Sequence, residues 1–203
     1  MNKVQSFVCR GRPREFCVDT ALANALSVFW EKGYEGTSLT DLTDAMHITR
    51  PSLYAAYGNK ESLFRKALDL YEREKLAYIR EALKQPTARQ VAEAMLRGSV
   101  DNVTGENELH GCLGVITSVA CGPESQSVRE EVVKRGQAAK IALTERFVRA
   151  KEEGDLPSHV DPEGLMRVLS AMLQGISVQA NQGASREDLD RLVDTGLALW
   201  PSA

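Results

Sequence analysis

The sequence has few cysteines, and their placement excludes the usual chemistry of clustered cysteines. Four occur among 203 residues, and no two have the Cys-x-x-Cys spacing of a zinc or redox motif. They are also too scattered for the disulfide framework of a small secreted protein. We therefore expect no metal site and no secreted, disulfide-rich fold.

A secretory leader and a membrane span are not indicated either. The first residues, MNKVQSFVCRGRPREF, contain no apolar stretch of the kind that a signal peptide requires. The longest uncharged run, residues 168–185, contains three glutamines and one asparagine, which favour a buried helix over a membrane span. The sequence thus predicts a cytoplasmic protein with no membrane partner.

Motifs of catalytic sites are absent as well. The sequence has no HExxH, GxSxG, P-loop or GxGxxG pattern with which His47, His110 or His159 could act. We therefore expect no enzyme, no catalytic residue and no cofactor.

Strand signals are scarce, whereas helical periodicity runs through the chain. Alternation with a period of two and Asn-Gly or Asp-Gly turns are missing, and apolar residues repeat at helical spacing instead. Capping residues, glycines and prolines set the boundaries. The predicted helices are 18–33, 39–46, 49–58, 59–84, 87–104, 112–121, 125–153, 162–183 and 185–199. The sequence therefore predicts an all-α protein.

Charge is unevenly distributed along the chain, although the net charge is only −3. Residues 1–66 carry nine basic and seven acidic side chains, whereas the rest carries 16 and 21. A basic front end and an acidic back end indicate two parts with different partners, and the basic part suits a nucleic acid. We place the first domain at residues 1–66 and the second at 67–203, with a solvated N-terminal arm as the alternative explanation of the first arginines.

The predicted helices at 39–46 and 49–58 have the length and spacing of a helix-turn-helix, whose second helix enters the DNA major groove. Leu53 and Tyr57 would pack back onto the preceding helix and leave a small, polar front. Arg50 and Lys60 lie in first helical turns, where the helix dipole disfavours a cation by roughly 0.3–1 kcal/mol. Phosphates bound at these helix starts would relieve that cost, and solvated surface cations are the alternative.

Residues 31–64, EKGYEGTSLTDLTDAMHITRPSLYAAYGNKESLF, resemble the DNA-binding signature of the TetR family of bacterial transcriptional regulators. The positions in register are Gly33, Tyr34, Thr37, Ser38, Thr49, Leu53, Tyr54, Gly58, Asn59, Lys60, Glu61 and Leu63. The resemblance implies an N-terminal three-helix domain with a helix-turn-helix, joined by a long helix to an all-helical ligand-binding and dimerisation domain. Two positions depart from the family's pattern. His47 stands where a turn glycine is common, and Ala56 stands where a phosphate-contacting histidine is common, so that one phosphate contact is either absent or taken over by Tyr57.

The resemblance also implies roles for single residues. Thr37, Tyr54 and Lys60 would contact phosphates. The residues that would meet base edges are Arg50, Pro51, Ser52 and Ala55. An arginine there reads guanine through two hydrogen bonds, worth about 1–3 kcal/mol of discrimination. Arg10, Arg12 and Arg14 resemble the basic arms that some members place in the minor groove. The predicted DNA-binding set is Arg12, Arg14, Thr37, Thr49, Arg50, Pro51, Ser52, Tyr54, Ala55, Tyr57 and Lys60.

Two apolar stripes near the C-terminus match the helices through which the family dimerises. The resemblance implies a homodimer, which suits a palindromic operator because each half-site takes one protomer. For each single residue, the chain's own core is an equally good interpretation. The candidate interface residues are Leu165, Leu169, Met172, Leu173, Ile176, Leu189, Leu192, Val193 and Leu197.

The segment 110–122 is the candidate pocket for an unidentified small-molecule effector that releases a repressor from its operator. Its glycines and short apolar side chains leave room beside methionines, which adapt to an apolar ligand. Ordinary core packing is the alternative. The candidate pocket residues are Met95, His110, Cys112, Ile116, Met166 and Met172.

Two further functions stay open at this point. Cys112 or Cys121 would make the regulator a thiol sensor of oxidants or electrophiles, unless both sulfurs are simply buried apolar groups. A helical adaptor that binds protein and no DNA would explain the amphipathic helices but not the register of the signature. Affinity for duplex DNA that falls with salt separates a regulator from an adaptor.

Overall fold

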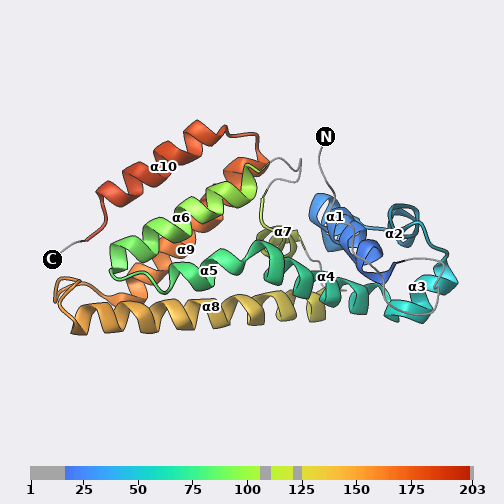
Figure 1. Ribbon diagram of the computed structural model, residues 1–203, viewed down its shortest axis with the longest axis horizontal. Coiled ribbons are helices and arrows are strands. Elements are labelled where there is room, and N and C mark those ends of the chain that lie inside the picture. Colours follow the sequence, from blue (N-terminus) through green and yellow to red (C-terminus); the bar gives the residue numbers. More distant parts are fainter. Residues whose placement is uncertain (1–16, 106–110, 121–124, 202–203) are drawn as a thin grey trace. The chain divides into compact units, whose positions relative to one another are not determined.

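The computed structural model describes residues 17–105, 111–120 and 125–201, and these residues are mostly helical with no strand among them. The helices labelled in Figure 1 are α1 (Val18–Gly36), α2 (Leu39–Met46), α3 (Arg50–Tyr57), α4 (Lys60–Lys75), α5 (Ala77–Ala82), α6 (Ala88–Val103), α7 (Leu113–Ala120), α8 (Gln126–Glu152), α9 (Pro162–Asn181) and α10 (Arg186–Ala198). The predicted all-α fold is confirmed. In the described part of the chain, no helix has both the length and the apolar character needed to cross a membrane.

The chain divides into two compact units. Unit 1 ends at Arg73 and unit 2 begins at Glu74, so the boundary falls in the last turn of α4. The sequence places this boundary between residues 66 and 67, where one long helix over 59–84 is expected. That expectation is wrong in one respect, because Leu76 leaves the helical conformation and separates α4 from α5.

The segment that follows the break packs closely on α6. A Cβ atom at Gly98 of α6 would lie 2.4 Å from Cδ2 of Tyr78, so the Tyr78 ring lies directly on the α6 backbone. No proline or glycine stands at the break, and α5 is held on α6 by this close packing.

The helices of unit 1 begin where their sequence signals predict. Ser38 accepts a hydrogen bond from the Asp41 backbone N–H, and the Asp41 carboxylate accepts one from the Ser38 N–H, which completes the predicted capping box. The Asp41 carboxylate also pairs with Lys32 at 2.5 Å. The ammonium of Lys32 and the two Ser38 donors hold the pKa of Asp41 well below its usual range. Thr49 caps α3 by accepting from the Ser52 N–H at 3.3 Å.

Two residues with positive φ shape the turns of unit 1. Gly33, with φ of 69°, interrupts α1 at the position where the sequence ends the first helix, although a helical turn continues to Gly36. His47, with φ of 54° and ψ of 44°, adopts the left-handed conformation between α2 and α3. Histidine thus occupies the backbone region that a turn glycine takes more easily.

Aromatic and leucine side chains form the core of unit 1. The rings of Phe29 and Phe64 lie 4.9 Å apart, edge to face, and those of Trp30 and Tyr71 lie 5.0 Å apart, so α1 and α4 are fixed together. Leu42 of α2 and Leu53 of α3 are fully buried. Each short helix is therefore anchored by its apolar side.

Unit 2 is organised around α6. This helix contacts α5, α8, α9 and α10, and Figure 1 shows α6, α9 and α10 side by side. The core includes Leu96 of α6, Phe147 of α8, Leu169 of α9 and Val193 of α10, all fully buried. The sequence signals at Asp161, Pro162 and Ser185 start α9 and α10 as predicted.

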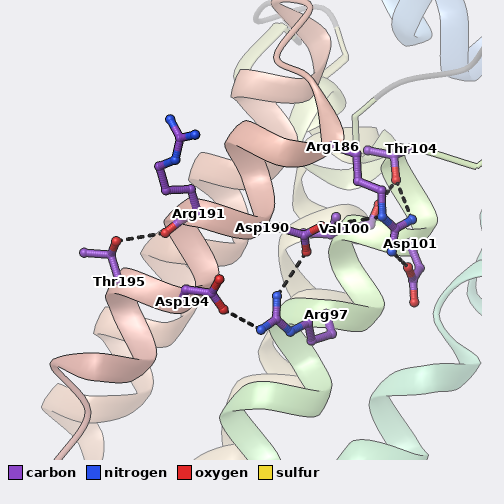
Figure 2. A network of polar contacts seen from close by, with 9 residues as sticks. All are labelled: Arg97, Val100, Asp101, Thr104, Arg186, Asp190, Arg191, Asp194 and Thr195. Atoms are coloured by element: carbon purple, nitrogen blue, oxygen red, sulfur yellow. Dashed lines mark hydrogen bonds and ion pairs between the residues drawn. The ribbon is translucent and has the colours of Figure 1, made fainter.

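A polar network ties α10 to α6 at the surface of unit 2 (Figure 2). Arg97 of α6 contacts Asp190 at 3.0 Å and Asp194 at 2.5 Å. Arg186, at the start of α10, contacts Asp101 and donates to the Thr104 hydroxyl at 3.2 Å. Alternating charges on two neighbouring helices therefore fix their register.

Candidate nucleic-acid interface

One side of helix α3 is buried and the other is exposed to solvent. Leu53 and Tyr57 are buried at 0% and 3% relative exposure, whereas Tyr54 is 48% exposed. Arg50, Pro51 and Ala55 are exposed as well, and Ser52 is half-buried. Most residues that the sequence assigns to the front of this helix therefore lie together on the free surface of unit 1.

The Arg50 side chain is held in place by α2. Its Nη2 donates a hydrogen bond to the Thr40 hydroxyl over 2.9 Å. No carboxylate pairs with this guanidinium in the part of the chain that the structure describes. Sequence reasoning missed Thr40, because its position on α2 signals nothing until α3 folds back beside it.

The N-cap of α3 engages two of the predicted DNA-binding residues. The hydroxyls of Thr49 and Ser52 lie 3.0 Å apart, and the Thr49 hydroxyl also accepts the Ser52 backbone N–H. The two hydroxyls therefore share a local hydrogen bond, after which the Thr49 hydroxyl keeps one further hydrogen-bonding position and the Ser52 hydroxyl keeps two.

Lys60 at the start of α4 rests on an aromatic ring. Its Nζ lies 4.4 Å from the centroid of the Tyr34 ring, which in turn packs edge to face on Phe64 at 5.0 Å. A cation over the face of tyrosine is attracted by about 0.5–1 kcal/mol, which is comparable to the cost of a cation at a helix start. Tyr34 therefore both orients Lys60 and offsets part of that cost, a role that its position in the sequence does not reveal.

The structure removes Thr37 and Tyr57 from the exposed set. Thr37 is buried, and its hydroxyl donates to the Gly33 carbonyl at 2.6 Å, so no proton is left for a phosphate. The Tyr57 hydroxyl donates to the Val18 carbonyl at 2.8 Å. The Tyr57 bond ties α3 to the start of α1, whereas the Thr37 bond closes the end of α1. Arg12 and Arg14 lie outside the described residues.

The predicted pocket residues of unit 2 fall into two groups. Met95 and Met166 are buried in the common core, and Met172 packs against it with its terminal methyl on Gly196. Cys112 and Ile116 are half-buried at the start of α7, and His110 lies outside the described residues. The methionines therefore do gather in one core, with the Cys112 segment on a different element.

Polar groups surround Cys112, which forms no disulfide. Its backbone N–H donates to the Ser177 hydroxyl of α9 at 2.6 Å, and its side chain lies close enough to Tyr78 to act on that residue. Burial and then the Cys112 thiol raise the pKa of Tyr78 well above its usual value, while a hydrogen bond with Ser99 acts in the opposite direction. Cys17, by contrast, is disulfide-bonded, which the cysteine spacing did not predict. Cys121 lies outside the described residues.

The candidate interface residues near the C-terminus are mostly core residues of one protomer. Those with 8% exposure or less are Leu165, Leu169, Ile176, Leu189, Val193 and Leu197. Met172, Leu173 and Leu192 are half-buried against the same core. Of the two interpretations left open by the sequence, the chain's own core therefore holds for the six buried residues.

A different row on α9 is free to meet a partner. Val168 is 54% exposed and Val178 is 45% exposed, with exposed Ala171 and half-buried Gly175 between them. A Cβ atom at Gly175 would meet nothing within 4 Å. The spacing of three and four residues places all four on one side of the helix.

Comparison with known proteins gives a consistent result along the chain. The family model described as bacterial regulatory proteins, tetR family, matches residues 21–67. The HTH-type transcriptional repressor ComR of Escherichia coli (strain K12) is 33% identical over 195 residues, which cover 95% of this chain and 92% of that protein. The uncharacterized HTH-type transcriptional regulator YezE of Bacillus subtilis (strain 168) is 28% identical over 93% of this chain and 98% of its own length.

A solved structure is similar over almost the whole chain. It is a cysteine mutant of the TetR family transcriptional regulator CifR, complexed with 26-bp double-strand operator DNA. The two chains are 41% identical, with a TM-score of 0.88, over 94% of this chain and 100% of that one. The similarity extends through both units.

Proposed function

The chain belongs to the TetR family of bacterial regulatory proteins, and on that premise we propose that it is a repressor released from its operator by a small molecule. It is a DNA-binding transcriptional regulator that acts as a homodimer on double-stranded DNA. The observation that carries the proposal is the exposed side of α3. Arg50, Pro51 and Tyr54 are exposed there, and the opposite side of the helix is buried. Repression is supported by the similarity to ComR, which is named a transcriptional repressor.

The contacts that we propose with DNA follow from the chemistry of each side chain. Tyr54 and Lys60 would donate to phosphates and so set the register of the protein on the duplex. Arg50 would read a guanine edge, with Pro51 and Ala55 in close contact beside it. Thr49 and Ser52 would add their remaining hydrogen-bonding positions.

Dimerisation is proposed through the exposed row of α9, Val168, Ala171, Gly175 and Val178. Small residues at its centre let two helices approach closely, and valines at its ends supply apolar area. A two-fold axis at this row would present two copies of α3 to two half-sites of a palindromic operator.

The effector is proposed to bind in unit 2. Tyr78, Ser99 and Ser177 offer hydroxyl groups, and Met95 and Met166 offer adaptable apolar surface. A small molecule with an apolar body and a polar end fits this combination. The thiol of Cys112 lies in the same surroundings. Sensing of oxidants or electrophiles through this thiol is therefore the second candidate form of regulation.

We assign the protein no catalytic activity, since its relatives are regulatory proteins. Its proposed place is the cytoplasm, where a bacterial regulator meets chromosomal DNA.

The experiment that tests the proposal measures binding of the full chain to duplex DNA at several salt concentrations. The duplexes are the region upstream of its own coding sequence and the products of a random-duplex selection. Lys60→Ala should weaken binding and lower the magnitude of the slope of log K against log salt by about 2 for the dimer, because one phosphate per protomer is no longer neutralised. Tyr54→Phe should weaken binding because it removes one hydroxyl donor.

Lys66→Ala is the matched control, because this exposed lysine also lies on α4 but outside the proposed contact set. It should bind like the parent. Salt-independent binding, or Lys60→Ala with the slope and affinity of the parent, would contradict the proposed interface.

A further inference from the structure

Arg50 is oriented by a partner on a different helix. It is the first residue of α3, and its guanidinium reaches back to Thr40, the second residue of α2, over 2.9 Å. Both residues are exposed, so the bond lies on the same free surface as the other proposed DNA contacts. The left-handed turn at His47 is what brings the two helix starts within reach.

We propose that Thr40 is a positioning residue for specificity, which fixes the Arg50 guanidinium so that a single donor edge faces a guanine in the operator. The inference rests on the proposed function, namely that α3 reads DNA. It goes further because it makes the preference of Arg50 for guanine depend on Thr40, a residue of α2 that contacts no base.

The chemistry of the guanidinium makes this selection possible. Its five N–H groups form two forks, one from Nε and Nη2 and one from Nη1 and Nη2. Each fork uses one Nη2 hydrogen, so the bond to Thr40 occupies one fork. The other fork keeps two parallel donors, which is the arrangement that matches O6 and N7 of guanine.

A neutral partner suits this role better than a carboxylate. A carboxylate would cancel the charge that attracts the side chain to DNA. The nearest acid in sequence, Asp41, is engaged by Lys32 and Ser38 instead. The Thr40 hydroxyl therefore orients Arg50 and leaves its charge available.

The bond also restricts a flexible side chain before DNA arrives. Arginine has many rotamers, and a side chain already held in its bound orientation loses less entropy when it binds. A freely rotating Arg50 would present either fork, or a single donor, to whichever base stands opposite. Removal of the Thr40 hydroxyl should therefore relax the choice of base more than it weakens binding.

The test compares Thr40→Val, which keeps the shape and removes the acceptor, with Thr40→Ser, which keeps the hydroxyl. Each full-length variant is titrated with the selected operator duplex and with duplexes that carry symmetric single base-pair changes in both half-sites, at one salt concentration. The parent should prefer guanine at one position by about 5- to 150-fold, and Arg50→Ala should abolish that preference. Thr40→Val should reduce it by about threefold or more, while Thr40→Ser retains it.

Two controls separate positioning from a general effect on folding. Thr43→Val makes the same chemical change on α2, where the Thr43 hydroxyl donates to the Leu39 carbonyl at 3.0 Å, and should leave the base preference unchanged. In the Arg50→Ala background, Thr40→Val should have no additional effect on that preference, since the two residues act as one unit.

Two results would overturn the inference while leaving the proposed function intact. One is a Thr40→Val variant with the base preferences of the parent. The other is a variant that binds all duplexes more weakly by a common factor, because that result would make Thr40 a phosphate contact or a folding determinant. A parent that shows no sequence preference at all would overturn both the proposed function and this inference.

Discussion

At the scale of single residues, Arg146 of α8 is the most unusually placed charge in the described part of unit 2. Its side chain is only 5% exposed. Nη2 donates to the carbonyls of Gln85 at 2.9 Å and Pro86 at 2.7 Å, whereas Nε and Nη1 are buried with no partner among the described residues. A buried cation balanced by two carbonyls alone costs several kcal/mol of desolvation.

Arg146→Met should therefore stabilise the protein, by about 1–3 kcal/mol, because it removes that charge and keeps the apolar part of the side chain. The two carbonyls lie on residues that are half-buried or exposed, so water can replace the missing donors. Urea unfolding followed by circular dichroism measures the change. Arg149→Met, at an exposed position one turn on, should shift stability by no more than about 0.5 kcal/mol. A clear decrease of stability in Arg146→Met would show that the two hydrogen bonds outweigh the desolvation cost.

At the scale of elements, the same sequence signals that start helices do not say how helices are joined. The capping boxes at Ser38 and Ser185 are formed as their spacing predicts. The network between α6 and α10 in Figure 2 joins residues about ninety positions apart and has no local signal. It holds α10 in register on a helix that is central to unit 2.

Removal of Arg97 should loosen this junction. We expect Arg97→Ala to lower the free energy of unfolding by about 0.5–1 kcal/mol, because two exposed ion pairs are removed together. The difference from the parent should shrink as NaCl is raised from about 0.05 M to about 1 M, since salt screens exposed charges. Denaturant curves at both salt concentrations give the measurement.

Arg167→Ala is the matched control, since Arg167 pairs with Glu163 on its own helix. It should cost less, about 0.3 kcal/mol. Equal decreases in the two variants, unaffected by salt, would count against a role for the network in holding α10.

At the scale of the whole molecule, the arrangement of half-sites on DNA depends on which face pairs two protomers. The buried leucines of α9 and α10 are occupied within one protomer, and the exposed row of α9 is proposed as the contact. Val168→Glu should therefore convert the dimer to monomers, because a charge would be buried in an apolar contact. Light scattering after gel filtration measures the mass, and the affinity for a palindromic duplex should fall in parallel.

Val133→Glu is the control for this prediction. Val133 is 55% exposed and lies on α8 rather than in the proposed row of α9, so this variant should stay dimeric and bind DNA as the parent does. A dimeric Val168→Glu protein with the helicity of the parent would refute the proposed interface.

Features that depend on neighbouring residues could be predicted from the amino-acid order alone. Capping chemistry and apolar spacing act within a few residues. They predict the turn at His47, the buried side of α3 and the helix starts at Ser38, Thr49, Asp161 and Ser185. The signature within residues 31–64 identified the family for the same reason, because it is a local pattern.

The packing of the folded chain, by contrast, determines which side chains those elements leave free. The family resemblance gives Thr37 and Tyr57 contacts with DNA, yet their hydroxyls are bonded to carbonyls of α1. The buried leucines of α9 and α10 likewise belong to the core of unit 2. No local pattern predicts the break at Leu76. The contact of Lys60 with the Tyr34 ring and the hydrogen bond from Arg50 to Thr40 likewise join residues that no local pattern connects. An apolar stripe or a polar group specifies that a partner is needed, but only the folded chain determines whether that partner is another residue of the same protomer, a second copy or DNA.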